Sequence, residues 1–248
     1  MNTVSAAMGV TELEVRRRVR VAVFSNGDEI VEPGAARAPV QLYDSNRFML
    51  AAMLRRIGCE VTDLGILPDD ADRIAGILKA QAAAHDLILT SGGVSTGDAD
   101  YVKDAIERVG SMVFWRMAIK PGRPVAMGVI EGTPFIGLPG NPVASFVTFA
   151  HVVRPAVFAL AGAEWRKPVG VQVRAAFNYR KKSGRREYVR ANLRRAEDGA
   201  WEAIKFPREG AGLLSSLIDT DGLVELSEEI TSIEPGRMVE FLAYTSLL

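Results

Sequence analysis

Acidic side chains recur in this chain where buried β-strands are predicted to end. Asp28 and Glu29 follow one apolar run, Asp69 follows a second, and Asp98 and Asp100 follow a third. Such carboxylates are the oxygen ligands that Mg²⁺ prefers, together with water and substrate phosphates. Helix capping is the alternative for Asp69 and Asp100, because each stands where a helix is predicted to begin. Together with the basic segment described next, the acids favour metal-assisted chemistry on an anion.

A basic segment, WRMAIKPGRP at residues 115–124, places Arg116, Lys120 and Arg123 around a Gly/Pro turn. Lysine and arginine both hold oxyanions, and arginine does so through two parallel hydrogen bonds. A solvated loop is the alternative. A second segment, residues 180–195, carries eight basic residues and one acid. An exposed hairpin is favoured there over a nucleic-acid strip, because 30 basic and 30 acidic residues leave the chain with no net charge.

Two loops rich in glycine or proline also follow predicted strands. The first, SGGVSTGDAD, contains Gly92 and Gly93, whose missing side chains let backbone N–H groups approach an anion. The helix predicted to follow adds a favourable potential at its N-terminus. The second loop is LPGNP, residues 138–142. Plain turns are the alternative for both. Neither GxxxxGK[ST] nor GxGxxG occurs, so P-loop and Rossmann-type sites are not predicted.

The elements that position these loops alternate along the first two thirds of the chain. Strands are predicted at residues 19–24, 59–67, 86–91, 112–119, 125–130 and 134–138, and helices at residues 44–57, 70–84, 100–109 and 143–161. Apolar strands with short connections predict an α/β fold, a mostly parallel sheet with helices on both faces. Ligands of such sheets bind at the carboxyl ends of the strands. We therefore expect the loops to gather along one edge.

The pattern of apolar and polar residues changes after Gly162. Short runs with alternating polarity, separated by Gly, Asp or Pro, predict a small all-β domain, either a sandwich or a barrel. We place the two domains at residues 1–163 and 164–248.

Composition narrows the classes of protein further. The 248 residues are 48% hydrophobic and 24% charged, as expected of a globular protein. Cys59 is the only cysteine, which excludes disulfides and cysteine-based zinc sites within one chain. No signal peptide is recognised, and no apolar run is expected to reach transmembrane length. We expect a cytoplasmic protein that binds neither membrane nor nucleic acid.

Six motifs, in this order, resemble the MoeA/gephyrin E-domain family of molybdopterin molybdenumtransferases: FSNGDEI, YDSN, LGILPDD, SGGVSTGDADYVK, FWRMAIKPGRP and GLPGNPVAS. Three later segments resemble that family's C-terminal β-domain: GRREYVRANL, GAGLLSSLIDTDGLVEL and EPGRMVEF. The resemblance covers residues 18–245 and implies a MogA-like three-layer α/β/α domain followed by the β-domain. The SGGVS and LPGNP loops are shared with MogA-type adenylyltransferases and CinA-like proteins, from which the β-domain motifs separate this chain.

The resemblance implies a reaction in molybdenum cofactor biosynthesis. Adenylated molybdopterin and molybdate are its substrates, the adenylate is hydrolysed, AMP leaves, and Mg²⁺ assists. It implies catalytic roles for Asp28, Glu29, Asp69, Asp100, Arg116 and Lys120, with Glu29, Asp69 and Asp100 as metal ligands. We further hypothesise that the two loops cradle the pterin and its phosphate, through Ser91, Gly92, Gly93, Val94, Ser95, Asp98, Pro139, Gly140, Asn141, Pro142 and Ser145.

Three features depart from the family pattern. Arg116 stands where lysine is usual, and Asn26 replaces a threonine beside the acids. Family members carry two further domains ahead of the matching part, which help to form a homodimer and complete its site. Met1 here lies shortly before the first predicted strand, so impaired turnover is an expectation. A MogA-like adenylyltransferase and a non-catalytic molybdopterin-binding module are the alternative functions.

Overall fold

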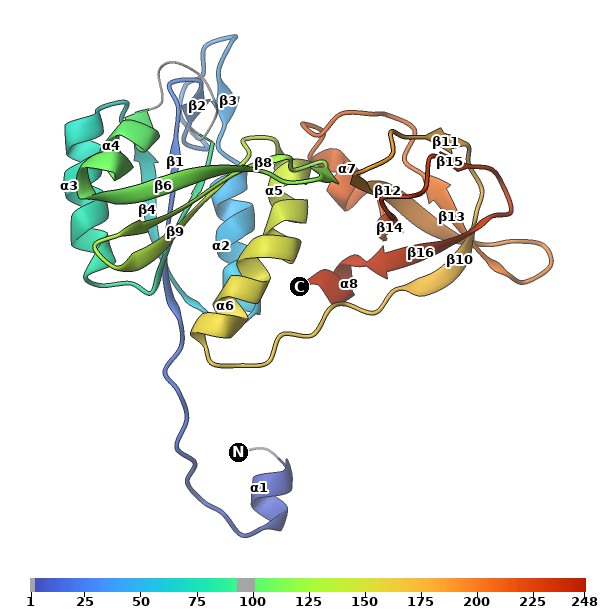
Figure 1. Ribbon diagram of the computed structural model, residues 1–248, viewed down its shortest axis with the longest axis horizontal. Helices are drawn as coiled ribbons and strands as arrows, with labels where there is room; N and C mark the ends of the chain where they lie inside the picture. The colour runs from blue at the N-terminus through green and yellow to red at the C-terminus, as the bar shows by residue number, and fades with distance from the viewer. Residues whose placement is uncertain (1–2, 93–100) are drawn as a thin grey trace.

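The computed structural model describes residues 3–92 and 101–248, apart from the side chains of residues 114 and 115. Two units lie side by side, an α/β unit and a β-barrel (Figure 1). The short helix α1 (Thr3–Ala7) stands apart from both, at the end of an extended segment. That segment is tied to the α/β unit by Arg17, whose guanidinium donates two hydrogen bonds to the Asp86 carboxylate.

The α/β unit is built on a six-stranded sheet with the order β4-β1-β5-β9-β8-β6. Its strands are β1 (Arg20–Asn26), β4 (Glu60–Leu67), β5 (Leu87–Ser91), β6 (Gly110–Arg116), β8 (Pro124–Ile130) and β9 (Thr133–Leu138). The first four strands in the order are parallel, and β8 runs antiparallel to both of its neighbours. The predicted mostly parallel sheet is confirmed.

Helices cover both faces because the central strands are apolar on both sides. In β1, Val21 and Val23 belong to one core cluster and Ala22 and Phe24 to the other, as the alternation of a strand requires. The first face is covered by α2 (Asn46–Arg56) and by the continuous run α5 (Pro142–Thr148), η1 (Phe149–Val153) and α6 (Arg154–Leu160). The second is covered by α3 (Ala71–Ala82) and α4 (Tyr101–Val109).

The helical run Pro142–Leu160 is long and apolar enough to cross a membrane, by length and composition alone. This corrects the expectation that no apolar run would reach transmembrane length. More than half of its apolar window, 56%, is buried inside the protein. Val147 and Phe149 are completely buried in the cluster that also contains Val23 of β1, so the run is a core helix of the α/β unit.

The second unit is a five-stranded barrel. Of the two predicted all-β forms, a sandwich and a barrel, the structure has the barrel. Its strands are β10 (Val171–Ala175), β12 (Arg186–Arg195), β13 (Trp201–Lys205), β14 (Gly222–Leu226) and β16 (Met238–Ala243). They follow one another as β13-β10-β16-β14-β12, and the pairing of β12 with β13 closes the ring. Two short strands, β11 (Tyr179–Arg180) and β15 (Ser232–Ile233), pair beside it. The helices α7 (Ser215–Ile218) and α8 (Tyr244–Leu247) complete the unit.

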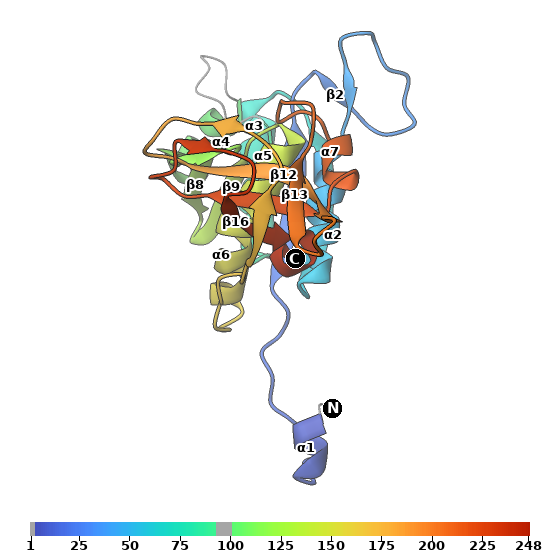
Figure 2. The ribbon, with the colours of Figure 1, turned by 90° about the vertical axis from the view of Figure 1, so that its right-hand side faces the viewer.

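The two units share both a sheet and a core. The short strand β7 (Ile119–Lys120) leaves the α/β unit and pairs with β12 of the barrel. Tyr188 of β12 stacks on His151 of η1, with 4.5 Å between ring centroids. Tyr244 of α8 meets Phe146 of α5 edge-on at 5.2 Å. Figure 2 shows the barrel lying across the α5–α6 side of the α/β unit.

Candidate functional site

The carboxyl ends of the central strands meet at one edge of the sheet, as predicted. Ser25 of β1 pairs with Ser91 of β5, and Ser91 pairs in turn with Leu138 of β9. The loops that follow these strands therefore start side by side. Gly92 has a φ of +85°, and a Cβ on it would lie 3.3 Å from the carbonyl oxygen of Asn26. Glycine is required there because two loops touch through their backbones.

The predicted acids of the first two loops come together at this edge. The Asn26 amide donates a 2.5 Å hydrogen bond to Asp69. Burial raises the pKa of Asp69, the Asn26 amide opposes this, and the negative charge of Asp28 raises it further. The cap of α3 is Asp70, which accepts from the backbone N–H of Arg73. The capping alternative is therefore wrong for Asp69.

The donor chemistry of this edge suits a hard cation. Among the described residues, no basic side chain forms an ion pair with Asp28, Glu29 or Asp69, and the negative charge of Asp28 raises the pKa of Asp69. The Glu29 carboxylate lies against Gly27, where an added Cβ would be 2.5 Å from it. Within residues 3–92 and 101–248, no three acidic, histidine or cysteine side chains form a cluster able to hold a metal. The third predicted ligand, Asp100, lies outside the described residues.

Asn46, at the start of α2, joins the two glycine-containing loops. Its Nδ2 donates to Ser91 Oγ at 2.8 Å and to the Gly140 carbonyl at 2.6 Å. Its Oδ1 is buried and has no partner among the described residues. The sequence placed Asn46 in the YDSN motif but gave it no role, because contacts to residues 45 and 94 positions away leave no local signal.

Arg47, the next residue of α2, holds the segment that carries β2 (Ile30–Val31) and β3 (Leu42–Tyr43). The buried guanidinium pairs with Asp44 at 2.9 Å, with Glu32 at 2.6 Å and with Asp63. Burial opposes the charged form of Arg47, but hydrogen bonds to Asp63 and Asp44 raise its pKa overall. Figures 1 and 2 show the segment with β2 and β3 projecting beyond the sheet edge. Arg47 thus anchors the loop that begins with the acids Asp28 and Glu29.

Of the eleven predicted pterin-binding residues, Gly92 and Gly140 belong to the loops joined by Asn46, Pro142 begins α5, and the other eight form three groups. Gly93, Val94, Ser95 and Asp98 lie outside the described residues. Ser91 and Ser145 are buried, and their hydroxyls donate to the Pro139 carbonyl, which gives them a part in holding the second loop. Two members of the second loop, Pro139 and Asn141, line a pocket at the junction of the two units.

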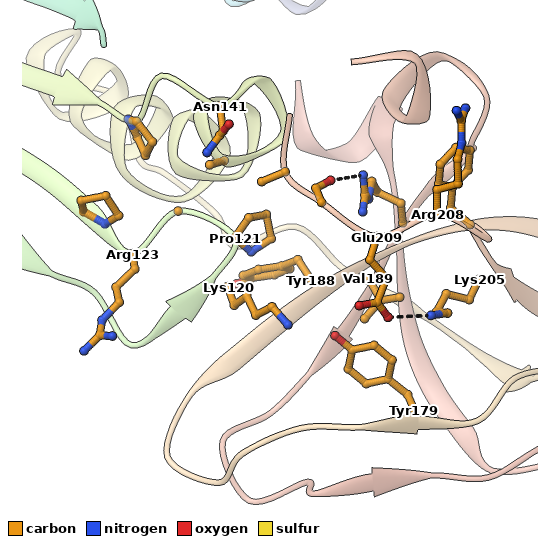
Figure 3. Close-up of a pocket in the computed structure, with 18 residues that line it drawn as sticks. Lys120, Pro121, Arg123, Asn141, Tyr179, Tyr188, Val189, Lys205, Arg208 and Glu209 are labelled. Carbon is orange, nitrogen blue, oxygen red and sulfur yellow. Dashed lines mark hydrogen bonds and ion pairs between the residues drawn. The ribbon is translucent and has the colours of Figure 1, made fainter. Parts of the chain in front are cut away.

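This junction pocket has a volume of about 340 Å³ (Figure 3). The α/β unit contributes the second loop and the strap, which we define as residues 120–123. The barrel contributes Tyr188 and Arg190 of β12, Lys205 of β13, and the segment 206–211 after it. The strap is held against α5, since a Cβ on Gly122 would lie 2.6 Å from Thr148 Oγ1.

The junction pocket is rich in positive charge. Five cationic side chains and one acid line it: Lys120, Arg123, Arg190, Lys205, Arg208 and Glu209. Glu209 pairs with Lys205 at 3.1 Å (Figure 3). Arg190 donates to Ser216 Oγ at 2.6 Å and to the Gly210 carbonyl at 2.9 Å, both neutral acceptors. Burial lowers the pKa of Arg190, and no described carboxylate forms an ion pair with it.

The two predicted basic residues occupy different places. Lys120 borders the junction pocket, half exposed, with its ammonium 3.5 Å from the buried Glu187 carboxylate. Arg116 ends β6 and is exposed outside that pocket. The sequence missed Arg190 and Ser216 as site residues. It favoured an exposed hairpin over residues 180–195, which is wrong for β12, where Tyr188, Val189 and Ala191 are buried.

The α/β unit brings acids and small loops to one sheet edge, and the barrel adds cations beside it. Together they define a two-unit protein with a positively charged pocket at its junction. Residues 22–159 match the family described as "Probable molybdopterin binding domain". Residues 172–244 match "MoeA C-terminal region (domain IV)". The chain therefore belongs to the MoeA family.

Named relatives agree with this assignment. The chain is 39% identical over 244 residues to "Molybdopterin molybdenumtransferase" of Haemophilus influenzae, and 34% identical over 243 residues to "Molybdopterin molybdenumtransferase 2" of Mycobacterium tuberculosis. The alignments cover 98% and 95% of this chain, but 60% and 59% of the relatives. A crystal structure of the molybdopterin biosynthesis MoeA protein from Pyrococcus horikoshii superposes with a TM-score of 0.78 and 31% identity, covering 97% of this chain and 58% of that one. The chain thus spans about 60% of the length of these curated relatives.

Proposed function

We propose that this protein acts in molybdenum cofactor biosynthesis, where it binds adenylated molybdopterin and molybdate, inserts the metal and releases AMP. The observation that carries the proposal is the half-buried Arg190 guanidinium, which faces a pocket built from both units and has no ion-paired carboxylate among the described residues. A desolvated cation of this kind is stabilised by an anion. Molybdate is a tetrahedral dianion, to which guanidinium and ammonium groups donate charge-assisted hydrogen bonds.

The acids at the sheet edge suit the other half of the reaction. Glu29 and Asp69, with Asp100, are the proposed ligands of Mg²⁺, which when bound neutralises charge on the phosphates of the substrate. Asn26 orients Asp69 through its amide. Asn46 holds the two loops proposed to cradle the pterin and its phosphate at a fixed separation. The chain's own residues thereby position the phosphoanhydride bond and keep its surroundings polar.

The proposal extends to the assembly and the cell compartment. Adenylated molybdopterin and molybdate are the proposed partners, and the proposed protein is a cytoplasmic homodimer. The MoeA assignment and the barrel favour metal insertion over the adenylyltransferase alternative.

The test mixes the full chain with adenylated molybdopterin, Mg²⁺ and molybdate, and records bound pterin and released AMP. We expect AMP release that depends on molybdate and falls by at least about 100-fold in Asp69→Asn. Arg195→Ala is the control, because Arg195 stacks on Trp201, outside the junction pocket. Pterin binding without AMP release would support the non-catalytic module instead. AMP formation from ATP and molybdopterin would support the adenylyltransferase.

A further inference from the structure

Glu187 of β12 is a buried acid at the point where the strap meets the barrel. Only 1% of its side chain is exposed, and both of its carboxylate oxygens have donors. Oε1 accepts from Arg185 Nε at 2.6 Å, and Oε2 accepts from the Tyr179 hydroxyl at 2.7 Å. The Lys120 ammonium lies 3.5 Å from Oε2. Burial of a carboxylate is unfavourable without such partners, so these three side chains determine where the carboxylate lies.

The three contacts of Glu187 are unequal, which shows which residue positions the other. Arg185 and Tyr179 both belong to the barrel and hold the carboxylate at hydrogen-bond distance. Burial raises the pKa of Tyr179, and the hydrogen bond to Glu187 raises it further, so the hydroxyl remains a donor. Lys120 comes from the strap, makes the longest of the three contacts, and has 51% of its side chain exposed. The carboxylate is therefore fixed without Lys120, whereas the place of the Lys120 ammonium depends on the carboxylate.

The backbone of Lys120 is held by the same strand of the barrel. In the parallel pairing of β7 with β12, Lys120 stands directly opposite Glu187. An exposed lysine has a long, flexible side chain that otherwise samples many conformations. Strand pairing at the base of the side chain and a fixed carboxylate at its tip restrict the ammonium to one place.

Glu187 itself does not line the junction pocket, whereas its partners Lys120 and Tyr179 do (Figure 3). A carboxylate in direct contact with a bound oxyanion would also repel it. Glu187 can therefore act on an anion in the junction pocket only through the side chains that it holds.

We propose that Glu187 is a positioning residue of the proposed reaction, which acts by holding the Lys120 ammonium at the border of the junction pocket. The inference rests on the proposed function, in which Lys120 acts on the substrates bound there. Catalysis requires such groups to be in place before the substrate reacts. The alternative is a purely structural role, in which Glu187 only joins the strap to the barrel.

The first test is a double-mutant cycle in the full chain. AMP release is measured in single turnover with adenylated molybdopterin, Mg²⁺ and molybdate. We expect Glu187→Gln, which keeps the shape but not the charge, to slow AMP release about tenfold. The molybdate concentration for half-maximal rate should not rise, because the charge removed is negative.

The second half of the cycle tests whether Glu187 acts through Lys120. In the Lys120→Met protein, Glu187→Gln should have no further effect on AMP release, because the side chain that it positions is gone. If Glu187→Gln slows release equally with and without Lys120, the role of Glu187 is structural and the proposal is overturned. Glu187→Asp keeps the buried charge and takes the place of Glu187→Gln in the cycle if the latter does not fold.

Glu225→Gln is the matched control. Glu225 is a buried acid of β14 in the same barrel, and its partners Arg186 and Lys167 lie outside the junction pocket. We expect Glu225→Gln to leave AMP release unchanged. A loss in Glu225→Gln as large as in Glu187→Gln would also overturn the proposal, because loss of any buried barrel carboxylate would then suffice.

NMR relaxation separates this inference from the proposed function, because it needs no substrate. The side chain of Lys120 should be more ordered in the unsubstituted protein than in Glu187→Gln. Lys205, which pairs with Glu209 in the same pocket, should be equally ordered in both. If Lys120 loses order in Glu187→Gln but the unsubstituted protein releases no AMP, the proposed function fails and the positioning of Lys120 stands. If AMP is released and Lys120 is equally ordered in both proteins, the inference alone is overturned.

Discussion

Arg190 shows how a single residue can serve binding at the expense of stability. Its guanidinium is half-buried on β12, next to the Phe206 ring at 5.6 Å, and both of its hydrogen-bond acceptors are neutral. Burying a charge without a counter-charge is unfavourable for folding. The same feature makes the guanidinium available to an anion that enters the junction pocket.

Substitution of Arg190 should therefore separate binding from stability. We expect Arg190→Met to abolish measurable molybdate binding while the melting temperature stays the same or rises, because a half-buried charge without an ion-pair partner among the described residues is replaced by apolar volume. Arg190→Lys should keep the charge but lose the planar fork, with affinity lowered about tenfold. Isothermal titration and thermal unfolding measure the two effects. A large fall in melting temperature for Arg190→Met would contradict this account.

Asn46 is the second residue whose side chain has more than a local effect. We expect Asn46→Ala to destabilise the protein by about 1–3 kcal/mol, because the buried Ser91 hydroxyl and the Gly140 carbonyl lose their donor. It should also weaken pterin binding, since the two loops are no longer joined. The control is Asn192→Ala, which removes a similar bond to the Asp219 carbonyl on the barrel. Pterin affinity that falls equally in both variants would argue against a specific role for Asn46.

At the scale of elements, the strap is the segment on which the junction pocket depends. Gly122 has a φ of +107°, and a Cβ there would meet the buried Thr148 hydroxyl at 2.6 Å. The strap therefore packs on α5 more closely than a side chain allows. Its neighbour β7 pairs with β12, so the same few residues join the α/β unit to the barrel.

We expect Gly122→Ala to cost about 2–4 kcal/mol of stability, from backbone strain together with the clash. The control is Gly132→Ala, which has a similar φ of +89° but open space around it, and should cost only about 1–2 kcal/mol. Adding Thr148→Ala to Gly122→Ala should recover part of the difference. Chemical denaturation measures all three variants. Equal losses at Gly122 and Gly132 would mean that contact with α5 is unimportant.

The sequence predicted the sheet and its helices because their signals are local. Continuous apolar runs such as residues 19–24 mark strands buried on both faces, and they were confirmed. β7 was missed because it was merged into a strand at residues 112–119, and its partner lies 67 residues away at Arg186 and Glu187. The junction pocket was missed for the same reason, because the residues that line it are far apart in the sequence. Arg190 and the PGN loop meet only after the barrel docks on α5.

For the candidate site, the sequence predicted which residues take part better than it predicted which other residues they contact. The acids at the sheet edge were recognised from their position after strands, and Asp28 and Asp69 do come together. Asn46 and Arg47 could not be recognised, because their importance comes from contacts with several distant loops. The catalytic, metal-binding and pterin-binding roles assigned to these and the other site residues remain predictions, and Asp100 and residues 93–95 and 98 lie outside the described residues.

At the scale of the whole molecule, the contact between the units contains a buried histidine. His151 of η1 stacks on Tyr188 of the barrel, and its Nε2 has no described partner. Burial lowers the pKa of His151 from 6.5 to about 4, and the charges of Lys167, Arg186 and Arg154 add to the effect. The imidazole is therefore neutral in the folded protein well below the pH at which it ionises in the unfolded chain.

Stability should consequently fall as the pH is lowered from about 6.5 to about 4. In that interval the unfolded state binds a proton that the folded state does not, which corresponds to at most about 3 kcal/mol. We expect His151→Phe, which keeps the stacked ring, to lose this component while other groups titrate unchanged. Urea denaturation at several pH values measures it. An identical pH dependence in both proteins would contradict the assigned pKa direction.

The central claim is that both units together form one oxyanion site. The most direct measurement is a crystal structure of the full chain with molybdate, in which the anomalous scattering of molybdenum locates the ion. The account predicts a single strong peak in the junction pocket, within hydrogen-bond distance of Arg190 and the strap, that is absent in Arg190→Met crystals. A peak elsewhere on the molecule, or an unchanged peak in Arg190→Met, would contradict it.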